Sequence, residues 1–104
     1  SEQYTPVPPA PDPATLELPT IFSPNNDGVN DFYKPRMSFA EWAEWEVFTR
    51  DGQRVFYGQT VEASWDGTVG GRPAPQGVYF VRARCGNTQT PDTPEAATAF
   101  HLQR

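Results

Sequence analysis

The sequence predicts an all-β sandwich, and three observations support this prediction. Twelve prolines and eight glycines in 104 residues argue against long helices. Apolar segments are short and alternate with turn-forming residues about every ten residues, a spacing typical of sandwiches. Aromatic residues make up 13% of the chain and apolar residues only 37%, so we expect a core built mainly from Phe, Trp and Tyr. A chain of this length is expected to form one domain.

The first 18 residues are expected to form a linker. Prolines stand at positions 6, 8, 9, 11 and 13, and such a composition keeps a chain extended and semi-rigid. Within this segment, residues 15–18 are a candidate edge strand. The folded domain is therefore expected over residues 19–104.

A β-hairpin is the clearest local prediction. Two β-prone segments, residues 45–50 and 53–57, flank Asp51 and Gly52. Asp-Gly between two such segments is typical of a two-residue type I′ turn, in which both residues have positive φ. Trp45 and Val47 are expected to share one face of the first strand.

Two further strands are expected near the C-terminal end. Residues 78–85 form an eight-residue segment in which Tyr79, Val81, Ala83 and Cys85 fall on one face. Residues 97–102 supply the last strand. Turns are predicted before them, at residues 65–67 and at residues 70–71.

The charge of the chain excludes several functions. A net charge of −5 and a pI near 4.6 argue against nucleic-acid binding and against an electrostatic membrane patch, since only eight residues are Lys or Arg. No segment approaches the roughly 20 apolar residues that span a bilayer, so direct membrane insertion is not expected. The single cysteine, Cys85, precludes an internal disulfide.

Three motifs, in order along the chain, resemble a known family. Residues 22–31 read Phe-Ser-Pro-Asn-Asn-Asp-Gly-Val-Asn-Asp, residues 65–68 Trp-Asp-Gly-Thr, and residues 71–79 Gly-Arg-Pro-Ala-Pro-Gln-Gly-Val-Tyr. They resemble the hallmarks of the gliding-motility-associated C-terminal domain, the type B sorting domain of the Bacteroidetes type IX secretion system. The chain differs at the hairpin turn, where Thr-Arg-Asp-Gly replaces the Asn-Arg-Trp-Gly usual in the family.

The resemblance implies both a fold and a function. The fold would be an Ig-like antiparallel β-sandwich of about seven short strands. The domain would be a secretion and sorting signal that directs upstream cargo domains of the same precursor across the outer membrane. Its partners would be the type IX translocon and a dedicated outer-membrane partner protein, and the cargo would reach the cell surface or the medium. We expect any signal peptide to lie upstream of this chain.

A second function class remains open from the sequence. Trp42, Trp45 and Trp65 are candidates for an aromatic platform, which would make the chain a calcium-assisted carbohydrate-binding or adhesin module. Packing of the same indoles in the core or at its rim is the alternative interpretation. A mechanical Ig-type spacer is a third hypothesis.

Catalytic chemistry is not expected. His101 is the single histidine and falls in a late strand, and Cys85 has the character of a small buried apolar residue. No glycine-rich phosphate loop is present, since the glycines at positions 67, 70 and 71 lack a following helix and lysine. We therefore predict no enzyme activity, no catalytic residues and no required cofactor.

The loop over residues 25–31 is the candidate metal site. Asn25, Asp27, the carbonyl group of Val29, and Asp31 supply the oxygen ligands that Ca²⁺ prefers. The bidentate glutamate of an EF-hand loop is missing. The same side chains also suit an Asx-turn network that caps its own backbone amides, and the sequence leaves both interpretations open.

Calcium binding by this loop predicts a measurable stabilisation. Ca²⁺ that binds only the folded state raises the melting temperature of the domain. Thermal unfolding with and without millimolar calcium checks this prediction. An unchanged melting temperature would support the Asx-turn interpretation instead.

Overall fold

A computed structural model describes residues 11–24 and 31–104, and these residues form an all-β, sandwich-like fold without a helix. The described segments accordingly contain no helix that could cross a membrane. This confirms the predicted fold class. The described strands are β1 (Thr15–Glu17), β2 (Ile21–Phe22), β3 (Arg36–Ser38), β4 (Trp42–Phe48), β5 (Arg54–Gly58), β6 (Thr68–Val69), β7 (Arg72–Pro73), β8 (Gly77–Gly86) and β9 (Glu95–Leu102).

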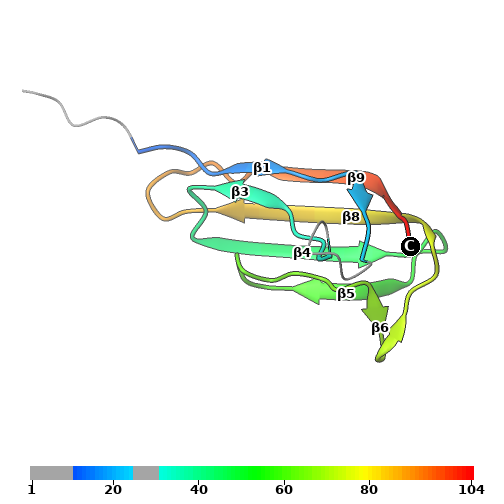
Figure 1. Cartoon of the computed structure of the whole chain (residues 1–104). Coiled ribbons are helices and arrows are strands. Elements are labelled where there is room, and N and C mark those ends of the chain that lie inside the picture. Colours follow the sequence, from blue (N-terminus) through cyan, green and yellow to red (C-terminus); the bar gives the residue numbers. More distant parts are fainter. Residues whose placement is uncertain (1–10, 25–30) are drawn as a thin grey trace, which may run out of the picture.

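One five-stranded sheet organises the molecule (Figure 1). Its strand order is β2-β9-β8-β4-β5. All neighbours in this sheet are antiparallel except β2, which pairs parallel with β9 and so departs from the expected purely antiparallel arrangement. The two-stranded sheets β1–β3 and β6–β7 are short. The nine described strands exceed the seven predicted, and three of them, β2, β6 and β7, have only two residues each.

Strand β8 shows why this sheet has two different faces. Its side chains alternate strictly, and Tyr79, Val81, Ala83 and Cys85 are all buried as predicted. The residues between them point the other way and are exposed. Because side chains repeat with a period of two along a strand, the antiparallel neighbours β4 and β9 follow the same division. We call the two sides the inner face and the outer face.

The hairpin of β4 and β5 is confirmed, but its predicted turn type is wrong. Thr49 donates its N–H to the carbonyl of Gln53 (2.8 Å), and Gly52 donates to the carbonyl of Thr49 (3.0 Å). Gly52 has φ +88°, whereas Asp51 does not have positive φ. The loop therefore has three residues, with a β-turn followed by a left-handed glycine. The pairing shifts register between Val47 and Phe48.

The two-residue turn with positive φ at both positions occurs elsewhere. Val69 and Arg72 pair across Gly70 and Gly71, whose φ values are +61° and +81°. These are the conformations that a type I′ turn requires, and glycine adopts them without strain. The β6–β7 hairpin therefore extends from the body as a tight ribbon (Figure 1).

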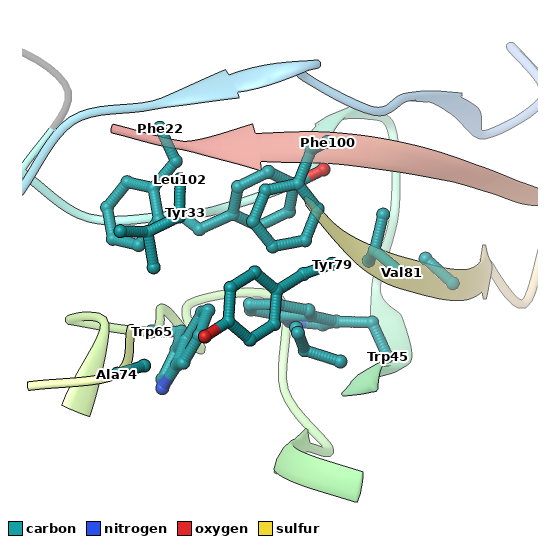
Figure 2. Packing of buried hydrophobic residues seen from close by; sticks show 11 residues of the cluster. Phe22, Tyr33, Trp45, Trp65, Ala74, Tyr79, Val81, Phe100 and Leu102 are labelled. Atoms are coloured by element: carbon teal, nitrogen blue, oxygen red, sulfur yellow. The ribbon is translucent and has the colours of Figure 1, made fainter. Parts of the chain in front are cut away.

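Aromatic rings fill the core against the inner face (Figure 2). Tyr33 stacks on Phe100 with ring centroids 4.2 Å apart, and Trp65 meets Tyr79 edge-on at 5.7 Å. Trp45 packs against Phe56 at 4.5 Å. Such pairs stabilise beyond their buried area by about 0.5–1.5 kcal/mol each. The core thus relies on aromatic residues, as the composition indicated.

A smaller cluster continues the core towards the N-terminal strand. Ala14, Ala43 and Cys85 are buried together, with Leu16 and Met37 packed against them. Leu16 and Met37 face each other in the β1–β3 pair. The expected edge strand at residues 15–18 is thus present as β1, and its side chains join the core.

Candidate functional site

The three sequence motifs meet at one end of the sandwich. Gly67 is their common point, because its carbonyl accepts hydrogen bonds from the N–H of Ala74 (2.8 Å) and from Nη2 of Arg104 (2.8 Å). A Cβ atom at Gly67 would lie 3.2 Å from both Phe22 and Pro24. Residues 22–24, 65–68 and 71–79 therefore pack together, and we call this region the motif end.

A compact turn shapes the second motif. Trp65 donates its indole N–H to the carbonyl of Thr68 (2.9 Å). Asp66 accepts from the N–H and the hydroxyl group of Thr68 at 3.0 and 2.7 Å. These hydrogen bonds lower the pKa of Asp66, since they favour the carboxylate. The polar groups of this motif are thus occupied in holding its own backbone.

Tyr79 fastens the third motif. Its ring is buried in the core and its hydroxyl donates to the carbonyl of Pro75 (2.6 Å). Burial raises the pKa of this phenol. Gly77, between the two residues, has φ +148°, a conformation that side chains rarely adopt. The proline-rich lead into β8 is therefore held against the core by one ring.

Tyr33 joins the segment that precedes β3 to the motif end. It exchanges backbone hydrogen bonds with Trp65, at 2.7 and 2.9 Å, in an isolated bridge. Its hydroxyl donates to the carbonyl of Pro19 (2.7 Å). Burial raises the pKa of Tyr33 strongly, so the folded state favours the neutral phenol. The Tyr33 contribution to stability is therefore present below pH 10 and is lost as the pH rises further, where the unfolded phenol ionises.

Arg104 is a residue of the motif end whose role the sequence did not reveal. Its guanidinium group donates to the carbonyls of Ala74 (2.9 Å) and Gly67 (2.8 Å), and its backbone N–H donates to the Gln76 side chain (3.0 Å). The arginine thereby ties the second motif to the third. Its acceptors are mainly backbone carbonyls, which leave no signature in a sequence.

The three indoles do not form one platform. Trp45 and Trp65 are 1% and 2% exposed, whereas Trp42 lies on the outer face and is partly exposed. Trp45 and Trp65 therefore pack in the core, and the separate position of Trp42 contradicts a surface shared by all three indoles. Of the described buried side-chain polar atoms, Nε1 of Trp45 alone has no hydrogen-bond partner.

The predicted calcium ligands are only partly within the described residues. Asn25, Asp27 and Val29 lie outside them, and Asp31 lies within them. The calcium interpretation therefore stays a prediction. Over residues 11–24 and 31–104, no cluster of three or more His, Cys, Asp or Glu side chains suits a metal ion.

The residues with catalytic potential are far apart. Cys85 is fully buried, and burial raises the pKa of its thiol, the opposite of an activated thiolate. His101 is exposed on β9 and pairs with Val78. Val78 is seven positions from Cys85 along β8, which corresponds to about 23 Å at the usual rise of a strand. These two residues do not form a nucleophile–base pair.

Gly67→Ala tests the packing of the motif end. We expect a loss of about 2–4 kcal/mol in unfolding free energy, because alanine is strained at φ +81° and its Cβ would press on Phe22 and Pro24. Gly70→Ala is the matched control, since Gly70 also has positive φ but no atom within 4 Å of an added Cβ. It should lose only about 1–2 kcal/mol. Equal losses in chemical denaturation would contradict close packing at Gly67.

Comparison with known proteins identifies a family. The sequence model of the CHU_C type IX secretion signal domain matches residues 16–97, a range that includes all three motifs. Searches of curated proteins and of solved structures gave no significant match. A type IX secretion signal is not a catalytic family; it is the sorting signal of a cargo precursor, and it interacts with the machinery that exports this cargo across the outer membrane. The chain belongs to the CHU_C type IX secretion signal domain family.

Proposed function

We propose that this domain acts as a folded sorting signal without catalytic activity or a required cofactor. The type IX translocon and a dedicated outer-membrane partner protein would bind it, and its cargo would be released or retained at the cell surface. The family match over residues 16–97 carries this proposal. We further infer that the chain is of the gliding-motility type B class of Bacteroidetes, as the three motifs suggest.

The burial and hydrogen bonds of the motif residues support a sorting signal rather than a catalytic site. Trp65, Gly67 and Tyr79 are buried, and their side-chain donors or backbone carbonyl bond to nearby backbone groups, with Gly67 also accepting from the Arg104 side chain. Exposed side chains at the motif end include Arg72 and Gln76. A rigid end of this kind presents a fixed shape to a partner, which lowers the ordering cost of binding. We propose that the recognition surface includes residues 73–77. The sequence prediction adds residues 25–31, of which only Asp31 lies within the described residues.

The adhesin hypothesis has no specific observation in its favour. Its platform would need several exposed indoles, and two of the three are in the core. A glycan array remains the direct check on it.

A reporter fusion tests the proposed function. A reporter carrying residues 1–104 at its C-terminal end should appear at the surface or in the medium of cells with an intact type IX system. It should stay in the periplasm of an otherwise identical strain that lacks the translocon. A reporter confined to the periplasm in both strains would contradict the proposal.

A shorter fusion provides a control for folding. Residues 19–104 lack β1, whose Leu16 packs against the core. We expect this fusion to be less stable and to export less than one beginning at residue 11. Export of both to the same level would show that β1 is dispensable for the signal.

A further inference from the structure

The outer face of the five-stranded sheet combines exposed aromatic rings with a row of charged side chains. The registers place Phe48 beside Phe80 and Phe80 beside Ala99, in one row across β4, β8 and β9. Phe80 is 45% exposed. With Ala97 the row lines a shallow groove, in which the alanines leave space beside the rings. Exposed apolar patches of this kind mark interaction sites.

A row of charged residues borders this groove. Arg82 lies between Glu46 and Ala97 in register, and Arg84 lies between Glu44 and Glu95. Arg82 also lies over the ring of Phe48, with its guanidinium carbon 6.0 Å from the ring centroid. The cationic and apolar groups therefore form one continuous surface.

Two carboxylates of this row, those of Glu44 and Glu46, already accept hydrogen bonds within the domain. Glu46 accepts from Arg82 through one oxygen and from Arg54 through the other. Glu44 accepts from Arg84 and from the hydroxyl group of Tyr57. The Glu46 side chain is only 13% exposed, whereas those of Arg54 and Arg82 are 54% and 64% exposed. Next to Phe48, an approaching partner thus meets the N–H groups of Arg54 and Arg82 rather than the Glu46 carboxylate. Glu95, beyond Arg84 in register, is exposed.

We propose that the outer face is the docking surface for a protein partner whose surface carries carboxylates around an apolar side chain. The apolar side chain would enter the groove between Phe48, Phe80 and Ala97, and the carboxylates would accept from Arg54, Arg82 and Arg84. This inference rests on the proposed function, because it assigns the outer face of the domain as the binding surface for the partner that recognises the sorting signal.

The charge balance favours a protein over an anionic membrane as the occupant. Arg54, Arg82 and Arg84 are matched in number by Glu44, Glu46 and Glu95 on the same face. Attraction to anionic lipid needs an excess of basic residues, usually clusters without acidic neighbours. An alternating pattern selects instead a partner with discrete acceptors at matching positions.

The proposal predicts which exposed residues matter for binding. Phe80→Thr removes the ring and keeps a strand-forming residue, and Arg82→Gln with Arg84→Gln removes two cationic donors. Each change should weaken binding of the 1–104 chain to isolated outer-membrane vesicles from type IX-competent cells by about tenfold or more. Export of the reporter should fall in parallel.

Matched controls lie off this face. Phe39→Asn removes an aromatic ring that is 59% exposed in the β3–β4 turn, and asparagine tolerates the φ of +59° found there. Arg36→Gln removes an exposed arginine from β3, where it pairs with Glu17. Both should bind and export like the parent. Thermal unfolding of each variant confirms that it is folded.

Each outcome decides between specific alternatives. Parent-level binding by the Phe80 and Arg82/Arg84 variants would overturn the assignment of this face while leaving export of the parent intact. Retained binding after protease treatment of the vesicles, or binding to phosphatidylglycerol vesicles, would overturn a protein partner in favour of lipid or glycan. Failure of the parent reporter to leave a competent cell would instead overturn the proposed function itself.

Discussion

The structure depends on how the inner face of the five-stranded sheet is covered. The opposing strands are too short to form a second full sheet, since β1 and β3 have three residues each. Aromatic side chains from connecting segments therefore complete the cover. Tyr33 and Trp65 pair through two backbone hydrogen bonds and place their rings against Phe100. Apolar burial is the main driving force for folding, so the turns that carry these rings belong to the core rather than to the surface.

This constraint explains what the family motifs do. The first contributes Phe22, the second Trp65 and the third Tyr79, and all three rings are buried in one cluster. Gly67 permits the close approach of the first and second motifs, and Arg104 ties the second motif to the third through backbone carbonyls. The motifs thus define the shape of one end of the domain. In our proposals, the partner binds exposed turns of the motif end and the outer face of the sheet.

Features set by side-chain alternation were predictable from the sequence, and features set by backbone geometry were not. The period-two pattern of Tyr79, Val81, Ala83 and Cys85 identified β8 and its buried face. Asp51-Gly52 located a hairpin but gave the wrong turn, because two-residue and three-residue loops both accept Asp followed by a left-handed Gly. The role of Arg104 was hidden because its guanidinium group binds backbone carbonyls. The parallel pairing of β2 with β9 depends on contacts between segments about 80 positions apart in the sequence, which no local pattern reports.

Native-state hydrogen exchange tests the central claim that the motif end belongs to the cooperative core. The N–H of Trp65 bonds to Tyr33 and the N–H of Ala74 bonds to Gly67, whereas Val81 lies in the middle of β8. If the motif end and the sheet form one unit, all three amides should exchange only through global unfolding, with the same free energy. Exchange of the Trp65 and Ala74 amides through local opening, at a much lower free energy than Val81, would contradict this account.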